Sequence, residues 1–550
     1  LSGSQVQILP SASFFVNRPA AFIQNIRLRL FMADEVDHRG EALPQLTKRS
    51  SSVNLNKLLK YHKPDFSSKK LSTFGFWPLA RLMISSGVNH QFRNVQCSKH
   101  ELITSGGPGM LAVSWHTAGL VDPMLIVNFL DKPYAFAGRH DLLTGPIIGF
   151  WGRRMGVQPL LRQAERKRGK VDDETASRVN ASSMLTVASK LANGHASVLM
   201  PEGHSHNEPH LIRLRTGPIR SALNAASIAQ VLDKKTPFLV PVGLTFREPH
   251  SWFSDVFVEF SEPIQLPLLT DKNHGNKLHS GDWVEPDEET TINVRNQLRD
   301  RLAPLTPDAP DWETWDAWLL LAHLQAEKDG RQLTTWAEEV LAAREIRDGF
   351  RNSSTGAWHG PEGSGEIDPA STHETVLIAK EVTSKISSLG GDSSYCVDKP
   401  RPNLLFNLIT TLTLLPLMLI SSPFAFLANG PQWIIGHILA QFNSEAIDKR
   451  TTYQSLPSTF GLFLFRPPIH AITIGLFWYF DYINNPLFFP LFFIFLWIIS
   501  DISLKCCRVW LKHLLNVRTA IIRWKIKSSH SWKNIEKEIK SLIPMLDALK

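Results

Sequence analysis

The feature that most constrains this sequence is an apolar stretch in its last third that carries no charge. Residues 404–427 contain no Asp, Glu, Lys, Arg or His, and a helix of that length can cross a hydrocarbon core of about 30 Å. Pro416 and Pro423 interrupt the stretch, so it predicts either a kinked membrane span or a re-entrant hairpin. The alternative is that it forms buried core helices of a soluble domain.

A second apolar block covers residues 469–504 and is divided by Asn484, Asn485 and Pro486, which predicts two closely spaced segments. Basic residues flank the two apolar regions: Lys399 and Arg401 before the first, and Lys505, Arg508 and Lys512 after the second. Because cytoplasmic flanks of membrane segments carry an excess of Lys and Arg, we expect a multi-pass or hairpin anchor with the preceding domain on the cytoplasmic side.

Composition narrows what the rest of the chain can be. With 43% hydrophobic and 20% charged residues, the chain is neither disordered nor a disulfide scaffold. A mean hydropathy of −0.10 excludes a pure membrane channel. The four cysteines form no CxxC pair, which excludes a zinc ribbon and favours a reduced compartment. The net charge of +8 favours anionic lipid or a phosphorylated substrate, because the sequence carries no nucleic-acid-binding signature.

These patterns divide the chain into five regions. We expect a leader and mobile arm over 1–70, an α/β domain over 71–270, a helical region and linker over 271–400, transmembrane helices over 401–505, and a basic amphipathic helix over 506–550. The last region suits the surface of an anionic leaflet. Residues 1–31 precede the first methionine and are left out of the fold prediction.

Short apolar runs alternate with helical patterns in the second region. Strands are expected over 110–115, 134–137, 196–200, 237–242 and 255–260. Apolar residues within 184–191 and 219–226 recur at the spacing of helices with one buried face. This alternation predicts an α/β domain with a mixed, largely parallel sheet flanked by helices. The apolar segment 71–84 predicts either an interfacial helix or the first helix of the core.

Polar residues follow two of the expected strands. His116 directly follows the expected strand 110–115, and Asp122 lies six residues further on. An imidazole oriented by a carboxylate can act as a general base. Residues 201–205 follow another strand, at the same edge of the sheet if it is parallel, and Gly203 lets backbone N–H groups approach an anion. Arginines that match phosphate geometry lie nearby in sequence: Arg213, Arg215 and Arg220, with Arg162 upstream.

Four ordered blocks resemble those of the glycerolipid acyltransferases. They are Ser-Trp-His at 114–116 with Asp-Pro at 122–123, Gly156 with Arg162, Pro-Glu-Gly-His-Ser at 201–205, and Val-Pro-Val-Gly at 240–243. The third block continues to Arg-Thr-Gly at 215–217 and is most similar to the branch that acylates glycerol 3-phosphate or dihydroxyacetone phosphate. The resemblance covers about residues 71–270, and it does not separate those acceptors from lysophosphatidic acid.

The resemblance implies a membrane-bound O-acyltransferase of phospholipid biosynthesis that takes its acyl group from acyl-CoA or acyl-carrier protein and needs no cofactor or metal. His116 would deprotonate the acceptor hydroxyl, which then attacks the acyl thioester, and Asp122 would orient the imidazole. The acceptor would be bound by residues of the second and third blocks: Arg162, Glu202, Gly203, His204, Ser205 and Arg215. Membrane lipids are the other expected partner, and nucleic acid is not expected.

The first block departs from the family pattern. Five residues separate His116 from Asp122 where four are usual, and Trp115 stands where Asn is usual. Either the turn is one residue longer and Asp122 still reaches the ring, or the pair is broken and the chain is a catalytically weakened module that binds lipid or acyl-CoA. The retained Asp-Pro dipeptide favours the longer turn.

Three other features allow two interpretations each. His204, His206 and His210 are closely spaced, but surface or substrate-facing histidines are favoured over a metal site. The Trp-rich segment 312–318 predicts a packing face rather than a ligand cage. The basic segment 162–170 is either a solvated loop or a binding element for phosphate or lipid headgroups.

Overall fold

The fold is taken from a computed structural model of the chain. Apart from isolated positions between residues 52 and 70, it describes residues 72–144, 147–168, 171–268, 272–355, 358, 360, 368–397, 404–442 and 447–546. The expected leader and arm over 1–70, and the basic flanks Lys399 and Arg401, therefore lie mostly or wholly outside the described residues.

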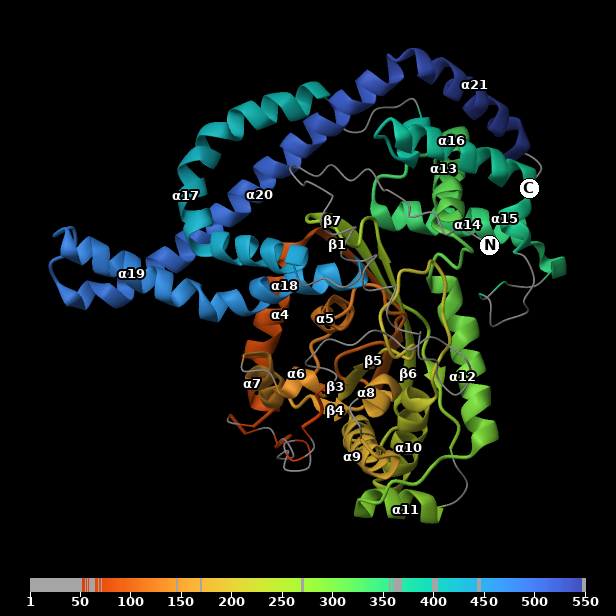
Figure 1. The fold of residues 1–550 in the computed structure, drawn as a ribbon, viewed down its shortest axis with the longest axis vertical. Coiled ribbons are helices and arrows are strands. Elements are labelled where there is room, and N and C mark those ends of the chain that lie inside the picture. Colours follow the sequence, from red (N-terminus) through yellow and green to blue (C-terminus); the bar gives the residue numbers. More distant parts are fainter. Residues whose placement is uncertain are drawn as a thin grey trace.

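A twisted sheet forms the centre of the domain, with strands in the order β1-β7-β6-β2-β5-β3-β4 (Figure 1). Neighbouring strands are parallel except that β6 is antiparallel to β7 and to β8. The strand bounds are β1 Phe92–Lys99, β2 Met110–Ser114, β3 Tyr134–Arg139, β4 Gln158–Leu160, β5 Ala196–Leu199, β6 Phe238–Phe246, β7 Ser254–Phe260 and β8 Ile264–Gln265. The mixed, largely parallel sheet and all five expected strands are confirmed.

Helices cover both faces of this sheet (Figure 1). Their bounds are η1 Phe74–Phe76, α4 Trp77–Gln91, α5 Val121–Asn128, α6 Asp141–Thr144, α7 Ile147–Arg154, α8 Gln163–Arg168, α9 Asp173–Ala192 and α10 Gly217–Val231. The expected helical patterns belong to α9 and α10, whose apolar positions are buried. In α4, Trp77, Met83 and Ile84 are buried as well, so the segment 71–84 includes the start of a core helix.

The core of the domain continues past the expected border at residue 270. Val294, Leu298 and Leu302 of the next helical segment belong to the same buried cluster as the strands. Those elements are α11 Lys272–Ser280, α12 Glu288–Leu302 and η2 Ala303–Leu305. The apolar positions of α12 are separated by polar ones, which is why its sequence looks like a charged connecting segment.

A second buried cluster holds the helical region together. Its elements are α13 Trp312–Lys328, α14 Trp336–Thr355, α15 Pro369–Thr372, α16 Glu374–Ser388 and η3 Ser393–Cys396. Trp315 and Trp318 are 3% and 0% exposed, which confirms the packing face.

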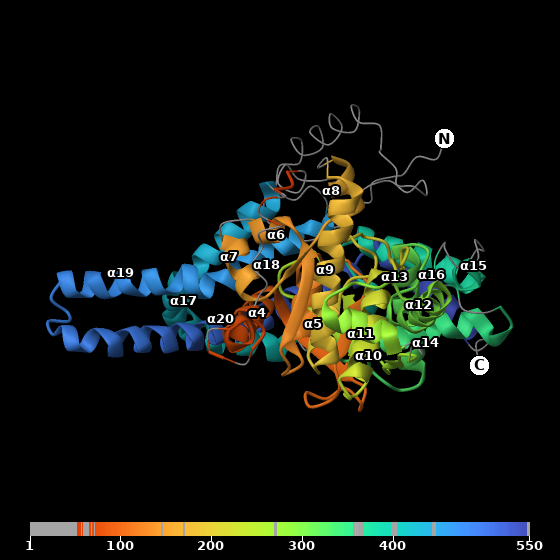
Figure 2. The ribbon, with the colours of Figure 1, turned by 90° about the horizontal axis from the view of Figure 1, so that it is seen from below.

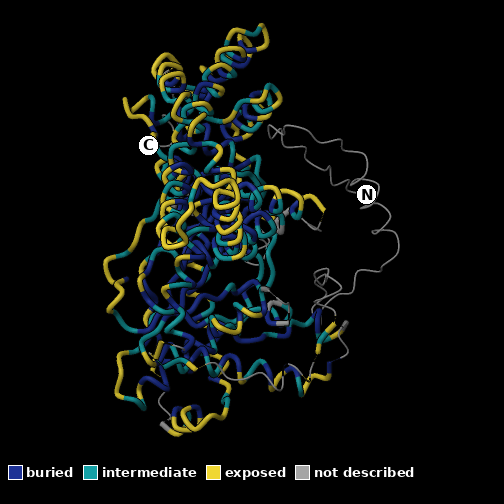
Figure 3. The backbone as a smooth tube through the Cα atoms, turned by 90° about the vertical axis from the view of Figure 1, so that its left-hand side faces the viewer, coloured by how far each residue is buried: buried dark blue, intermediate teal, exposed yellow. Residues whose placement is uncertain are grey.

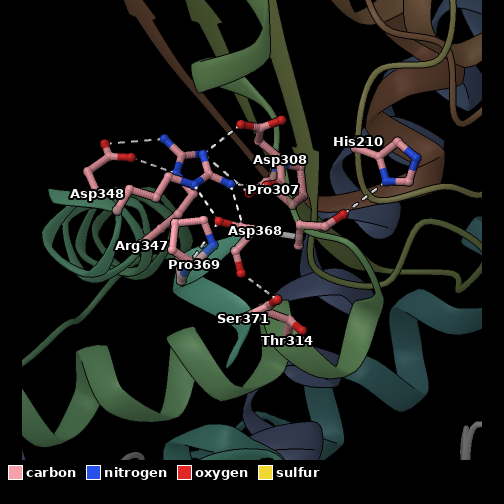
Figure 4. Close-up of polar contacts among 12 residues, drawn as sticks. His210, Pro307, Asp308, Thr314, Arg347, Asp348, Asp368, Pro369 and Ser371 are labelled. Carbon is pink, nitrogen blue, oxygen red and sulfur yellow. Dashed lines mark hydrogen bonds and ion pairs between the residues drawn. The ribbon is translucent and has the colours of Figure 1, made fainter. Parts of the chain in front are cut away.

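A buried ion-pair network joins this region to the sheet domain. Arg351 binds Asp308 at 2.6 Å and Asp368 at 3.0 Å, and Arg347 donates to the Thr306 and Pro307 carbonyls at 3.0 and 3.2 Å. Figure 4 shows Arg347, Asp308 and Asp368 gathered in this network, with His210 of the third block beside it. His210 Nδ1 donates to the Ala309 carbonyl at 2.9 Å, so the third block is connected directly to the helical region.

The apolar tail folds into long helices: α17 Leu404–Phe442, α18 Ile447–Leu464, α19 Arg466–Tyr479, η4 Pro486–Phe488, α20 Phe489–Lys527 and α21 His530–Met545. By length and composition alone, two of the described helical stretches could cross a membrane, α17 and Pro486–Lys527, or three if α18 and α19, bent by 47°, form one span. α17 is curved (Figure 1). It contains three prolines, Pro416, Pro423 and Pro431, and prolines bend helices.

The second apolar block forms the expected two segments. α19 and the first part of α20 run side by side as a hairpin that projects from the molecule (Figure 2). Figure 3 shows exposed residues along this hairpin, among them Tyr479, Tyr482 and Leu487, which are 76%, 76% and 81% exposed. Arg466 Nη1 pairs with Asp501 Oδ1 at 2.7 Å at the base of the hairpin.

The expected border at residue 505 lies inside α20, which continues without a break to Lys527. The apolar face of α21 is also not free, because Trp532, Ile535, Ile539 and Leu542 are buried in the core of the helical region. The expected amphipathic helix over 506–550 is therefore split between a continuous long helix and a packed one. The basic residues at the border change the polarity of α20 without ending it.

Candidate active site

The turn between β2 and α5 brings His116 and Asp122 together. His116 Nδ1 lies 2.8 Å from Asp122 Oδ2, so the longer turn forms and the pair is intact. Gly119 adopts a φ of +60°, a conformation that glycine reaches without steric cost, and this lets the five intervening residues fold back. The same Asp122 oxygen accepts the backbone N–H groups of Thr117 and Ala118 at 3.0 and 2.9 Å.

This geometry assigns the proton on the ring. An ionised carboxylate can only accept a hydrogen bond, so the Nδ1–H of His116 donates to Asp122 and Nε2 keeps its lone pair. The Asp122 side chain is fully buried in the first turn of α5, whereas that of His116 is 18% exposed. The arrangement can take a proton from a hydroxyl at Nε2 and stabilise the resulting imidazolium through Asp122.

Glu202 lies beside His116 because of the strand register. β2 and β5 pair in parallel with Val113 opposite Leu199. His116 and Glu202 each lie three residues further along the chain, just past the ends of these strands, so they leave the sheet at the same edge. Glu202 Oε2 accepts the His116 backbone N–H at 2.7 Å, and Oε1 accepts that of Ile212 at 2.9 Å. The residue is 1% exposed, so its carboxylate holds the main chain of the site, a different position from the acceptor contact that the resemblance implies.

His206 completes the polar layer behind His116. Its backbone N–H donates to the His116 carbonyl at 2.9 Å, and its Nε2 lies 3.0 Å from Glu202 Oε1. Burial alone would lower the pKa of His206, but the Glu202 carboxylate outweighs burial and raises it. Trp115 packs edge-on to this imidazole and donates its indole N–H to the Leu244 carbonyl at 2.7 Å, which accounts for a Trp at a position where the family has Asn.

Gly203 and Arg215 lie in direct contact. Gly203 has a φ of +81°, which favours glycine, and a Cβ atom there would lie 2.9 Å from Arg215 Nε, so another residue would also displace the Arg215 side chain. Arg215 Nε donates to the Glu202 carbonyl at 3.4 Å. No carboxylate among the described residues pairs with Arg215, which leaves its charge available for an anion.

Arg162, unlike Arg215, is paired with a carboxylate. Its guanidinium binds Glu165 Oε1 through Nε and Nη2 at 3.0 and 2.7 Å, and Glu165 is fully buried. Burial lowers the pKa of His204 to about 4, with the charges of His206, Arg162 and Arg215 acting in the same direction. His204 therefore lies within electrostatic reach of both arginines, and its imidazole is neutral at pH 7. Ser205 follows it in the same half-buried turn.

The comparisons with known proteins match the same part of the chain. Residues 94–245, which contain all of these groups, match the family model described as Acyltransferase. Residues 94–245 are thus similar to acyltransferases, and this part of the chain is called the acyltransferase domain below. This confirms the resemblance to the glycerolipid acyltransferases that the four blocks indicate.

Two curated relatives match parts of the chain. One is glycerol-3-phosphate O-acyltransferase 1 of Saccharomyces cerevisiae, 32% identical over 77 residues, or 14% of this chain and 10% of that protein. Another is an uncharacterized acyltransferase of Schizosaccharomyces pombe, 32% identical over 81 residues, or 15% of this chain and 12% of that protein. The aligned part thus spans only about a tenth of the length of these relatives.

Among solved structures, the 1-acyl-sn-glycerophosphate acyltransferase PlsC of Thermotoga maritima aligns with 40% of this chain and 79% of its own. The identity is 14% and the TM-score is 0.25. The fold described above therefore rests on the strand pairing of the acyltransferase domain itself and not on this alignment.

Two groups at the site of the acyltransferase domain were not expected from the sequence as parts of it. His206 belongs to the third block and to the histidine cluster, and its spacing of four residues from Glu202 is the signal that could have indicated a pair. Thr452 of α18 binds the backbone of the catalytic turn at Leu120, 332 residues away in the chain. No local sequence pattern signals such a contact.

Proposed function

We propose that this chain is a membrane-bound acyltransferase that transfers a fatty acyl group from acyl-CoA, or from acyl-carrier protein, to glycerol 3-phosphate or a related glycerol phosphate or lysophospholipid. The observation that carries the proposal is the 2.8 Å contact between His116 and Asp122 in a domain of the acyltransferase family. The name of the yeast relative supports glycerol 3-phosphate as the first acceptor to test.

In the proposed reaction, His116 Nε2 removes the proton of the acceptor hydroxyl as its oxygen attacks the thioester carbonyl. The C–S bond then breaks, the new ester is released, and the imidazolium returns its proton to the leaving thiolate. Asp122 stabilises the imidazolium and keeps the ring in position. The hydroxyl of the acceptor is itself the nucleophile, so this route uses no acyl-enzyme intermediate.

The acceptor phosphate is proposed to lie against Arg215, with Arg162 and the turn of Gly203, His204 and Ser205 nearby. Arg215 is the stronger candidate of the two arginines because Arg162 is already neutralised by the buried Glu165. Since Glu202 is buried and bound to backbone N–H groups, we assign it to positioning His116 and not to contact with the acceptor.

The bilayer is the proposed location of the tail. α17 and Pro486–Lys527 have the length and apolarity of membrane spans, and they expose large apolar side chains such as Leu405, Ile420 and Leu491, at 66%, 70% and 63%. Lys505, Arg508 and Lys512 follow the apolar part of α20, which by the positive-inside tendency supports a cytoplasmic acyltransferase domain.

The test is an acceptor panel on membranes that contain the full chain, with one acyl-CoA and with thiol release as the measurement. Glycerol 3-phosphate, dihydroxyacetone phosphate and lysophosphatidic acid are compared with a no-acceptor blank. We expect acceptor-dependent release that His116→Ala abolishes and that Asp122→Asn lowers by about 10³-fold or more.

His279→Ala is the control for these variants. His279 is an exposed histidine of α11. Equal turnover of His116→Ala and the unmodified chain would refute His116 as the base. Acceptor binding without turnover by the unmodified chain would instead favour a binding module.

A further inference from the structure

The apolar tail reaches the catalytic turn through α18. α18 packs against α4, which it crosses in Figure 1, and it also contacts α5. The contact is close, because a Cβ atom at Gly87 of α4 would lie 2.2 Å from Thr459 Oγ1 of α18. α18 lies outside the family match at 94–245, yet it packs against the part of the domain that holds His116.

Thr452 is the residue of α18 that touches the turn itself. Its Oγ1 accepts the Leu120 backbone N–H at 2.9 Å and lies 3.5 Å from the Ala118 carbonyl, to which the hydroxyl can donate. One side chain thus joins the two sides of Gly119, the residue with a φ of +60°. Asp122 holds the first part of the turn through the Thr117 and Ala118 N–H groups. The second part has backbone hydrogen bonds of its own, from Val121 to Ala118 and from Asp122 to Gly119, both at 3.3 Å, and Thr452 adds a bond from α18.

We propose that Thr452 is a positioning residue for the reaction: by fixing the backbone at Leu120 and Ala118, it keeps Asp122 in place against His116. This inference rests on the proposed function for its kinetic consequence, while the contact can be tested without activity. The physical reason is that the Leu120 N–H, in a half-buried turn, loses its partner without Thr452, and a less than fully solvated N–H without a partner destabilises the conformation that holds it. A turn released at Leu120 moves the first residues of α5, where Asp122 lies.

The neighbouring residue provides a matched control. Thr451 Oγ1 donates to the Pro249 carbonyl at 2.6 Å, so it also ties α18 to the domain, but it does not contact the turn. If α18 served only as packing, Thr451→Val and Thr452→Val would have similar effects. If Thr452 positions the turn, only its own replacement changes the chemistry, and Thr452→Ser restores it because serine keeps the hydroxyl.

Two measurements on the full chain in lipid test the proposal. In hydrogen–deuterium exchange, we expect faster exchange in peptides covering residues 117–122 for Thr452→Val, and unchanged exchange there for Thr451→Val and Thr452→Ser. In the thiol-release assay, we expect Thr452→Val to lower kcat by about tenfold or more while KM for acyl-CoA stays within about twofold, as misplacement of a catalytic group predicts.

Unchanged exchange and unchanged kcat in Thr452→Val would overturn the proposal, and so would equal losses in Thr451→Val. A lack of turnover by the unmodified chain with every acceptor would contradict the proposed function. In that case the exchange measurement still decides whether Thr452 holds the turn, so failure of the two ideas can be told apart.

Discussion

Glu202 Oε2 accepts the backbone N–H of His116 at 2.7 Å, so a carboxylate at the end of β5 fixes the main chain at the end of β2. Its other oxygen accepts the Ile212 N–H and lies 3.0 Å from His206 Nε2. The glutamate of the Glu-Gly pair therefore joins three segments of the domain. Its charge is balanced by N–H donors within the protein, and among the described residues no carboxylate pairs with Arg215.

This arrangement predicts that Glu202→Gln lowers kcat. Gln has the same shape, but its NH₂ group must face one of the N–H donors that Glu202 now binds, leaving a buried donor unmatched. We expect kcat to fall by roughly 10–100-fold, which is the size of losing one charged hydrogen bond. Glu208→Gln, at an exposed position in the same loop, is the control, and an equal loss there would contradict the assignment.

Arg215 is expected to govern acceptor affinity. Arg215→Gln should raise KM for glycerol 3-phosphate by about tenfold or more and leave KM for acyl-CoA nearly unchanged, because only the acceptor loses a charge-assisted hydrogen bond. Initial rates at varied acceptor give the answer. Arg220→Gln removes an exposed pair with Glu285 at 3.0 Å and should leave both constants alone; a matching rise in that variant would point to general charge rather than a specific site.

His204 predicts a stability loss in acid. Its pKa is about 4 in the folded chain against an ordinary 6.5, so below pH 6.5 the unfolded state binds more protons and stability falls until pH reaches about 4. The loss is absent above pH 6.5, where both states are neutral. Melting temperatures at pH 7 and pH 5 measure this, and His204→Gln should show a smaller drop between them. A drop as large as that of the unmodified chain would contradict the assignment.

The pair of Arg466 and Asp501 is expected to stabilise the projecting hairpin. Asp501→Ala leaves the Arg466 guanidinium, 2% exposed, with only Asn429 as a polar partner at 3.1 Å among the contacts described. The Asp501 side chain is 48% exposed, so solvent screens the pair and its loss costs less than that of a fully buried pair. The melting temperature in lipid should therefore fall by a few degrees. The double variant Arg466→Met with Asp501→Ala should recover part of that loss. If the double variant is the less stable one, the pair is not the cause.

The fold was predictable where burial leaves a strong pattern. β2, β5 and β6 lie in the middle of the sheet, and their unbroken apolar runs identify them. β1 was missed because it is an edge strand with sequence FRNVQCSK, whose outer positions are half-buried or exposed, so polar residues hide its alternation. β4 has only three residues, too few for any periodicity. The continuity of α20 was missed because its composition changes at Lys505 while its helical propensity does not.

The residues of the site were easier to predict from the sequence than the contacts that they make. The sequence indicates His116, Asp122 and the Glu-Gly turn, since each follows a strand at the same edge of the sheet. It does not indicate that Glu202 points inward to backbone N–H groups, or that Arg162 is paired with Glu165. The first depends on where the loop at Ile212 returns to the site. The second is a local contact three residues apart, and the spacing alone does not show that it forms. Thr452 could not be inferred, because a single hydroxyl far along the chain leaves no pattern.

The bond between Leu120 and Thr452 also sets an order in time. The two residues are 332 positions apart, and ribosomes add about 5–20 residues per second. Thr452 is therefore synthesised roughly 15–65 s after Leu120. Until then the turn beside His116 lacks its contact with α18, so the site is complete only after part of the apolar tail has been synthesised.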